Sequence, residues 1–372
     1  MYEFVVELKH TYKDSLMPKS TLFTQLTTLE ELTSEYRKTE LRRIAKNKDT
    51  PTATLVLLAG HEDIEIKDNV LGNTNTPNSV IQPYIDRLKK VSRADKHSSP
   101  DRYAVSWAAR QHGNLSRSIQ EYFAGEPELV SYFASNPKAD YDLLTKIADQ
   151  EILRPTGLSY NLAQNKGVKK DILLKLYNSG NAEIWRGICG NIKLPASVLT
   201  DMYEKATSKE KANLVPGITR NSSASPELLE KIYDEYEDNR TWLVLNPSVS
   251  HDFLMGIIRD RNAYARGAAV SNRKITVEDL LELIATGKRE DADIAIMSKK
   301  LPAKEVTNLL NRYIKDNTEE GRDLYGKIFY SAAFKVARGN PDLIVPEKPH
   351  PYSTRTERVL TNVLDRFLYT HR

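Results

Sequence analysis

The chain has 372 residues, of which 40% are apolar and 28% charged, and its formal net charge is +4. Single cores stop growing near ~250–300 residues, so we expect several domains or one long repeat array. One cysteine excludes a disulfide framework and a cysteine-rich zinc site. No apolar run approaches the ~18 residues of a membrane span, and the N-terminus lacks a basic signal-peptide region, so we expect a soluble cytoplasmic protein that binds no membrane.

Residues 1–37 precede the regular part of the chain, and we predict that they form an N-terminal cap. Met1–Leu8 alternates apolar and polar residues, which predicts a short strand. Thr28 and Glu31 have the spacing of a capping box, which predicts a helix that begins here and runs into Ala45.

An asparagine then recurs along residues 38–315, mostly at intervals of 25 or 26 residues. Gln111 and Ser298 fill two gaps in the series, and intervals of 38 and 30 residues indicate insertions. We call these asparagines the anchors: Asn47, Asn73, Asn136, Asn165, Asn191, Asn221, Asn246 and Asn272.

Three positions relative to the anchor are apolar in all ten units, although the composition predicts about four of ten by chance. Three residues before the anchors stand Ile44, Val70, Ala108, Phe133, Leu162, Ile188, Ile218, Leu243, Ala269 and Ala295. Eight residues after them stand Leu55, Ile81, Ile119, Leu144, Leu173, Leu199, Leu229, Leu254, Leu280 and Val306. Eleven residues after them stand Leu58, Tyr84, Tyr122, Ile147, Leu176, Met202, Ile232, Ile257, Leu283 and Leu309.

This spacing predicts a pair of helices in each unit. Positions +8, +11 and +12 share one helix face, and the prolines at +4 suit a first helical turn. The anchor then lies in the turn between two helices, where its amide can bond backbone groups left open at helix ends. A helix pair cannot bury its apolar face alone, so neighbouring pairs must stack. We therefore predict an all-α protein, a right-handed α-solenoid of about ten helix pairs of about 26 residues with atypical caps.

Units such as Phe133-Ala134-Ser135-Asn136-Pro137, followed by Leu143-Leu144 and Ile147-Ala148, resemble the leucine-rich repeat variant family. That family has superhelical helix-pair repeats similar in shape to HEAT and armadillo arrays. The resemblance covers residues 38–315 and departs from the pattern at Gln111 and Ser298. It implies a bacterial or phage-encoded scaffold that binds a partner, since such repeats serve mainly as binding surfaces.

Two segments carry opposite charge. Residues 86–117 contain eight Lys or Arg and three Asp, a balance of 8 − 3 = +5, and they include an insertion near 86–106. Residues 227–238 contain six carboxylates and one lysine, a balance of −5. Local fields of this kind steer partners more than the net charge does.

Residues 316–372 predict a C-terminal cap. Val336-Ala337 before Asn340-Pro341 repeats half of a unit, and residues 346–351 contain three prolines, which indicates an extended crossing. Thr354 and Glu357 then open a final amphipathic helix, for which docking of a partner is an alternative role.

Catalytic signatures are absent from the sequence: it contains no GxxxxGK[ST], GxGxxG, HExxH or GxSxG. The seven histidines do not pair at ligand spacing, and His97 and His112 fall in the basic segment. Cys189 occupies a position that other units fill with alanine, so we predict a small core residue. We predict no catalytic, cofactor-binding or metal-ligating residue, and hence no enzyme.

A column of cations lies five or six residues before the anchors, close to Trp107, Trp185 and Trp242. Stacked units would align these cations into a stripe that could follow a phosphate backbone, although pairing with carboxylates of the next unit is an equally simple role. The candidate polyanion-binding residues are Arg42, Lys67, Arg186, Arg240 and Arg266 of this column, and Arg87, Lys89, Lys90, Arg93, Lys96 and Arg102 of the basic segment.

Three functions remain open at this point. The leading hypothesis is a scaffold without catalytic activity that binds another macromolecule, foremost a protein, on its concave face. The alternative is a solenoid that binds nucleic acid through the basic segment and the arginine stripe. The third is similarity in shape to HEAT-like DNA glycosylases, which an Asp or Glu among Trp and Arg in a groove would favour. The sequence does not predict the oligomeric state.

Overall fold

The computed structural model describes residues 28–329 except 97, 261–263, 287, 288, 299, 314, 315, 317, 320 and 327. These residues form 22 α-helices, α2–α23, and one short 3₁₀ helix, η1 (Glu237–Asn239), with no strand among them. The all-α prediction is therefore confirmed. The strand predicted at Met1–Leu8 and the repeat half, crossing and helix predicted beyond residue 330 lie outside the described residues.

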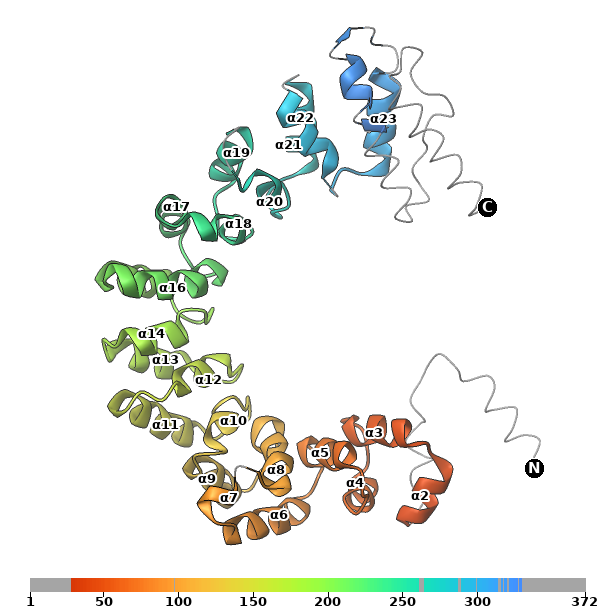
Figure 1. The fold of residues 1–372 in the computed structure, drawn as a ribbon, viewed down its shortest axis with the longest axis vertical. Helices are drawn as coiled ribbons and strands as arrows, with labels where there is room; N and C mark the ends of the chain where they lie inside the picture. Colours follow the sequence, from red (N-terminus) through yellow and green to blue (C-terminus); the bar gives the residue numbers. More distant parts are fainter. Residues whose placement is uncertain are drawn as a thin grey trace, which may run out of the picture. The chain divides into compact units, whose positions relative to one another are not determined.

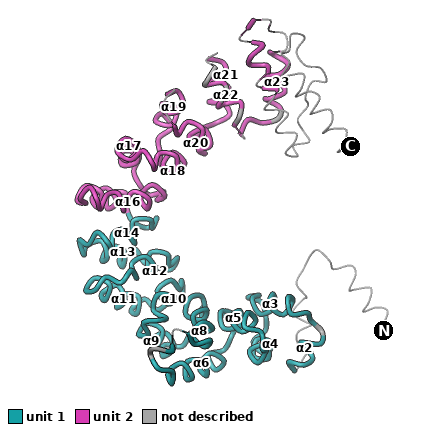
Figure 2. Tube along the Cα trace, viewed as in Figure 1, with its two compact units in different colours: residues 1–194 teal, residues 195–372 magenta. Residues whose placement is uncertain are grey.

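The chain divides into two compact units, residues 1–194 and residues 195–372 (Figure 2). Each is described by itself below. We call the helix before each anchor turn a first helix and the helix after it a second helix.

Unit 1 begins with α2 (Leu29–Glu35) and continues with alternating first and second helices. Its first helices are α3 (Lys38–Lys46), α5 (Ile64–Gly72), α8 (Pro100–Gln111), α10 (Val130–Ala134), α12 (Leu158–Gln164) and α14 (Ala182–Ile188). Its second helices are α4 (Thr52–Leu58), α6 (Asn78–Lys90), α9 (Arg117–Gly125), α11 (Tyr141–Leu153) and α13 (Lys170–Asn178). The additional helix α7 (Arg93–Lys96) lies in the predicted insertion.

Unit 2 begins with a second helix and follows the same alternation. Its first helices are α16 (Ser208–Arg220), α18 (Arg240–Leu243), α20 (Arg266–Val270) and α22 (Arg289–Met297). Its second helices are α15 (Ala196–Lys205), α17 (Pro226–Glu235), α19 (His251–Arg259), α21 (Val277–Ala285) and α23 (Ala303–Tyr313).

Helices pack mainly against their neighbours in the chain. In unit 1 the first helices form a row in which α3, α5, α8, α10, α12 and α14 each contact the next, while α11 contacts α9 and α13. In unit 2 the corresponding row is α16, α18, α20 and α22. Within each unit the first helices lie on one side of the second helices, most clearly for α10–α13 and α17–α20 (Figure 1). Each unit is thus a repeat-like, two-layered array of short helices.

The predicted columns form a regular part of the core. All ten residues three before the anchors and all ten residues eight after them are buried. In the column eleven after the anchors, eight residues are buried, and the exceptions are Tyr84 and Tyr122 beside the insertion. Burying one side chain of this size contributes roughly 1.5–3 kcal/mol, so these columns supply the main driving force for packing.

Each anchor closes its own turn through its side-chain oxygen. In Asn136 the Oδ1 atom accepts the N–H of Lys138 at 2.8 Å, and in Asn246 it accepts the N–H of Ser248 at 2.8 Å. The same bond two residues ahead occurs at all eight anchors. The anchors with described cap geometry are extended, as Asn47 (φ −70°) and Asn221 (φ −83°) show, so asparagine is favoured for its hydrogen bonds rather than for a left-handed backbone.

The amide nitrogen of the anchor bridges to the preceding helix pair, which the sequence did not reveal. Asn165 Nδ2 donates to the carbonyl oxygens of Ala134 (2.9 Å) and of the previous anchor, Asn136 (2.7 Å). Asn272 Nδ2 donates equivalently to Val244 (2.7 Å) and Asn246 (2.9 Å). One short side chain thus satisfies the carbonyls left open at the end of the previous first helix. We call each such bridge a rung.

At one predicted anchor the assignment is wrong by a residue. Gln111 ends α8, and it is His112 that caps the helix and accepts the N–H of Asn114 at Nδ1 (3.1 Å). His112 is buried, its Nε2 contacts the carbonyl of Thr76 at 2.9 Å, and its own carbonyl accepts the next rung from Asn136. The imidazole closes the turn as an anchor does, but its other ring nitrogen contacts Thr76 rather than the two carbonyls that a regular anchor bonds.

This correction also changes the columns after the turn. Counted from His112, position +11 is Phe123, which is fully buried, rather than Tyr122. Position +8 becomes Gln120, whose Nε2 donates to the carbonyl of Leu115 at 3.0 Å.

At Ser298 the anchor is replaced by two side chains. The Ser298 hydroxyl accepts the N–H of Lys300 at 3.3 Å and so closes the turn. The serine has no amide to reach back, and the Lys300 ammonium instead donates to the carbonyls of Asn272 and Ile275, the latter at 3.0 Å. Burial lowers the pKa of Lys300, and the charge of Asp279 offsets only part of this.

Two further sequence predictions need correction. The Thr28–Glu31 capping box is present, but the helix it opens ends at Glu35, and Glu40 accepts the N–H of Arg37 to begin α3 separately. Pro51, Pro77 and Pro195 occupy N-cap positions rather than the first helical turn. Their φ angles near −65° fit the extended cap residue equally well.

Candidate functional site

Three of the eight cations in the basic segment, residues 86–117, pair with carboxylates. Arg87 on α6 forms two parallel bonds of 2.8 Å with the carboxylate of Asp101 on α8. Its guanidinium also lies 4.5 Å from the ring centroid of Tyr84. A bidentate pair of this kind fixes the guanidinium in place and leaves it less able to bind a phosphate.

Two more cations of this segment pair with carboxylates outside it. Lys96 bonds Glu126 at 2.9 Å, with both side chains at most 15% exposed. Arg117 bonds Glu121 at 2.8 Å and Asp140 at 2.6 Å. The excess of +5 counted along the sequence is therefore reduced by acids outside the segment: Glu121 on α9, Glu126 at the end of α9 and Asp140 at the start of α11.

The remaining candidates of the segment are distributed differently. Lys89 lies over the ring of Tyr122, with its Nζ 5.0 Å from the centroid, and Lys90 is exposed. Arg102 is half-buried, and the side chain of Arg93 lies outside the described residues, as does His97.

The cation column does not form one uniform stripe. In unit 1, Arg42 bonds Asp63 at 2.8 Å and Glu65 at 2.6 Å, and Lys38 also bonds Asp63 at 2.8 Å. The hydrogen bond from Arg42 holds the pKa of the Asp63 carboxyl far below its usual range. Lys67 is half-buried. Arg42 therefore joins α3 to the N-terminus of α5.

The other members of the column differ from one another. Arg186 in unit 1 is exposed. In unit 2, Arg240 donates to the carbonyl of Tyr233 at 2.9 Å. Arg266 is 8% exposed and bonds Asp291 at 2.7 Å, so it is a core ion pair rather than a ligand-binding group. Pairing with neighbouring carboxylates describes Arg42 and Arg266 better than polyanion binding does.

The three tryptophans also have separate roles. Trp185 is 6% exposed and donates its indole N–H to the carbonyl of Tyr177 at 2.8 Å, so it belongs to the core. Trp107 is half-buried between first helices. Trp242 is 58% exposed, and the Arg220 guanidinium lies 5.6 Å from its ring centroid.

A buried carboxylate, Asp68 on α5, lies against Trp107 on α8. Asp68 is 7% exposed, and its Oδ1 and the Trp107 indole nitrogen are both buried without a hydrogen-bond partner. Burial, together with the charges of Glu65 and Asp63, raises the pKa of Asp68 to about 6, and Trp107 offsets only part of this. Sequence reasoning missed this pair, because the contact depends on how α5 packs against α8.

Another buried carboxylate, Glu151, is fully used by the fold. It accepts the backbone N–H groups of Thr156, Gly157 and Ser159 and the Thr156 hydroxyl at 2.7–3.1 Å. These bonds hold the start of α12 against α11 and keep the pKa of Glu151 low despite burial. Glu151 therefore has no spare capacity for acid–base chemistry.

Cys189 is buried, and burial raises the pKa of its thiol to about 12. The reactive form of a cysteine is the thiolate, so this residue is unsuited to act as a nucleophile.

Unit 2 separates charge between its two layers. Exposed carboxylates gather on the second helices, where Glu227 and Asp234 lie on α17 and Asp252 on α19. On the first helices α16, α18 and α20, the exposed residues near the anchor turns are apolar, small or basic. We define the Trp242 patch as Arg220, Trp242, Leu245 and the turn residue Arg273.

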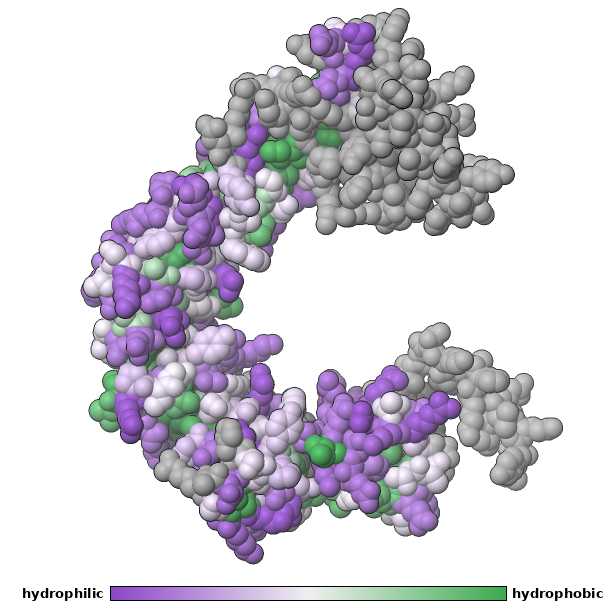
Figure 3. Space-filling model, viewed as in Figure 1, coloured by the Kyte–Doolittle hydropathy of each residue, from purple (hydrophilic) through white to green (hydrophobic). Residues whose placement is uncertain are grey.

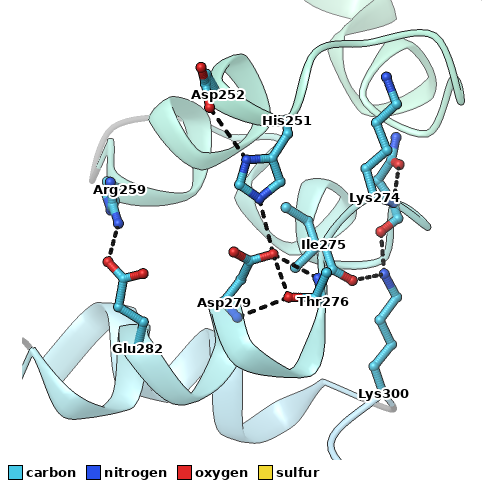
Figure 4. Close-up of polar contacts among 10 residues, drawn as sticks. His251, Asp252, Arg259, Lys274, Ile275, Thr276, Asp279, Glu282 and Lys300 are labelled. Carbon is cyan, nitrogen blue, oxygen red and sulfur yellow. Dashed lines mark hydrogen bonds and ion pairs between the residues drawn. The ribbon is translucent and has the colours of Figure 1, made fainter.

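His251 on α19 joins two second helices of unit 2. Its Nε2 lies 3.0 Å from the Asp279 carboxylate on α21 and its Nδ1 3.4 Å from Asp252 (Figure 4). Asp279 also accepts the N–H and hydroxyl of Thr276 in a capping box. The hydrogen bond to Asp279 raises the pKa of His251.

Neither metal binding nor membrane insertion finds support in the described part of the chain. No three His, Cys, Asp or Glu side chains gather there in a way that would hold a metal ion. None of the described helices has the length and hydropathy required to cross a bilayer.

Comparison with known proteins identifies no family. No protein-family model, no curated protein and no solved structure matches the chain.

Proposed function

We propose that the helix pairs stack into an α-solenoid of the kind found in the leucine-rich repeat variant family, and that the protein acts as a scaffold without catalytic activity. Two observations support the stacking. First helices contact first helices in a row within each unit, and the rungs repeat the same two acceptor positions from pair to pair. Units that contact only their neighbours are characteristic of solenoids.

The partner that we propose is a protein, bound on the first helices within a unit. The observation that carries this is the exposure of large side chains there: Tyr103 (54%) on α8, Tyr160 (58%) on α12 and Trp242 (58%) on α18. Tyrosine and tryptophan dominate the energetics of protein interfaces. The surface in Figure 3 is mainly hydrophilic with small apolar areas, which suits a partner that binds at a few such points.

The nucleic-acid alternative ranks second because its main cations are engaged. Arg87, Lys96, Arg117 and Arg42 all pair with carboxylates, which reduces the number of cations able to replace the counterions of a phosphate backbone. The glycosylase-like alternative ranks third. Asp68 does lie against Trp107, but the charges that act on it are carboxylates rather than arginines.

Site-specific photo-crosslinking in the native host tests this proposal. A photoreactive amino acid replaces Tyr160 or Trp242 on first helices, and Val56 on the second helix α4 serves as the matched exposed control (47%). We expect one recurring protein to crosslink at the first-helix positions and not at Val56. Equal crosslinking from both layers, or crosslinks to nucleic acid alone, would overturn the proposal.

A further inference from the structure

We propose that the Trp242 patch binds an acidic segment of a protein partner in which an apolar side chain lies next to carboxylates. This inference rests on the proposed function, because it names the chemistry of the partner at one point of the first-helix face. Its grounds are an open aromatic ring, a nearby aliphatic side chain and two guanidinium groups that pair with no carboxylate in the described part of the chain.

The apolar part of the patch consists of two exposed side chains in and just after one short helix. Trp242 on α18 is 58% exposed, and Leu245, which follows the C-cap residue Val244 and donates its N–H to the carbonyl of Trp242 at 3.2 Å, is 41% exposed. With more than half of its surface exposed, the indole of Trp242 is open to an apolar side chain of a partner.

The charged part of the patch is unbalanced within the described residues. Arg220 at the end of α16 lies over the Trp242 ring, and Arg273 in the turn after α20 is exposed. Among the described residues, neither guanidinium forms an ion pair with a carboxylate, unlike Arg259, which bonds Glu282 at 2.8 Å, and Arg266, which bonds Asp291. A carboxylate brought by a partner would meet two planar donors suited to bidentate pairing.

The charge separation of unit 2 also restricts where such a segment can bind. Carboxylates such as Asp234 on α17 and Asp252 on α19 repel an acidic chain from the second helices. Helices α16, α18 and α20 bear no described, exposed carboxylate next to the patch. The exposed carboxylates nearest to Trp242 in the chain are Glu237, which pairs with Arg240, and Asp238, both in η1 before α18.

The size of the patch favours a peptide over a nucleic acid. Two guanidiniums can neutralise about two phosphates, which gives a weak counterion-release term compared with the six to ten contacts of typical DNA-binding proteins. Trp and Arg beside an aliphatic residue are instead typical of hot spots in protein interfaces. Single-stranded DNA remains a distinct outcome of the test, because bases also stack on tryptophan.

The test pans a phage-displayed library of random 12-residue peptides against the full-length chain and measures enriched peptides by fluorescence anisotropy. We expect enrichment of Asp or Glu next to Phe, Trp or Leu. Affinity should fall roughly tenfold or more with Trp242→Ala and also with the double change Arg220→Gln and Arg273→Gln. The matched control Arg259→Gln on α19 should change it less than about twofold, and circular dichroism should show that all variants stay folded.

Several results would overturn the inference: no enrichment, enrichment without acidic residues, or binding that Trp242→Ala leaves unchanged. Binding of labelled oligo(dT) that depends on Trp242, together with no acidic peptide, would assign the patch to single-stranded nucleic acid instead. These failures are distinguishable from failure of the scaffold proposal, since crosslinking from Tyr160 would persist if only the patch assignment were wrong.

Discussion

The anchor turns of unit 2 and the interrupted turn at His112 in unit 1 differ in how fully their buried polar atoms are bonded. Asn246 donates two hydrogen bonds to the preceding pair and accepts one within its own turn. Around His112, by contrast, Asp68 and Trp107 each retain a buried polar atom without a hydrogen-bond partner. An insertion before a repeat position thus preserves the turn but disturbs the polar pairing of the helices next to it.

We expect the largest loss of stability from a change at Asn246, the anchor of a regular turn in unit 2. Asn246→Ala removes three bonds from a side chain that is 4% exposed, so we expect a loss of about 2–3 kcal/mol in the free energy of unfolding. Asn246→Asp should cost more than alanine, because a carboxylate would face the carbonyls of Thr219 and Asn221 without a proton to donate. Chemical denaturation measures both. The control Asn213→Ala, on the exposed face of α16, should stay within about 0.5 kcal/mol.

The next largest effect is a gain in stability rather than a loss, and we expect it from a change at Asp68, near the insertion. The pKa of Asp68, about 6, exceeds that of a carboxyl in the unfolded chain, so the folded protein retains a proton that the unfolded chain has lost. The stability that the protonated Asp68 carboxyl contributes is complete below pH ~4, and it is lost as the pH rises through ~6. Asp68→Asn should therefore stabilise the protein by on the order of 1–3 kcal/mol at pH 7 and by little at pH 4. Destabilisation at pH 7 would contradict the account.

We expect a smaller loss of stability from a change at His112, which takes the place of an anchor asparagine. His112→Ala removes the contacts with the Thr76 carbonyl and the Asn114 N–H, at a cost of roughly 1–2 kcal/mol. His112→Asn should recover part of this, since asparagine can still close the turn. Thermal melts give the melting temperatures of the two variants. Equal melting temperatures for His112→Asn and His112→Ala would show that His112 does not act as an anchor.

The smallest effect concerns the exposed pair of His251 and Asp279. The pKa of His251 is raised in the folded state, so its contribution is present below pH ~6.5 and is lost as pH rises through the folded-state pKa. His251 is 43% exposed, which limits the gain to a few tenths of a kcal/mol. Chemical denaturation should show that His251→Gln is less stable than the unchanged protein at pH 5.5 and equally stable at pH 8.

The repeating part of the fold could be predicted from sequence because burial and periodicity are linked. Leu55 and Leu144 are buried for the same reason at equivalent positions, so one alignment predicts both. Rungs could not be predicted, because the partner of Asn165 Nδ2 depends on how two helix pairs pack. The one-residue error at Gln111 arose because spacing alone cannot distinguish a longer helix from a longer turn.

The candidate binding residues were harder to predict than the core. A charge count along residues 86–117 omits Glu126 and Asp140, which come from outside the segment and pair with its cations. Trp242 was identified from its place in the repeat, but its exposure and the position of Arg220 over its ring required the structure.

Solution X-ray scattering of the 372-residue chain tests most directly whether the helix pairs stack into a solenoid, the central claim of this account. A compact protein of this length has a radius of gyration near ~21 Å. Stacking in which each pair contacts only its neighbours predicts an elongated particle with a value well above this. A radius of gyration at ~21 Å, with the profile of a compact globule, would contradict it.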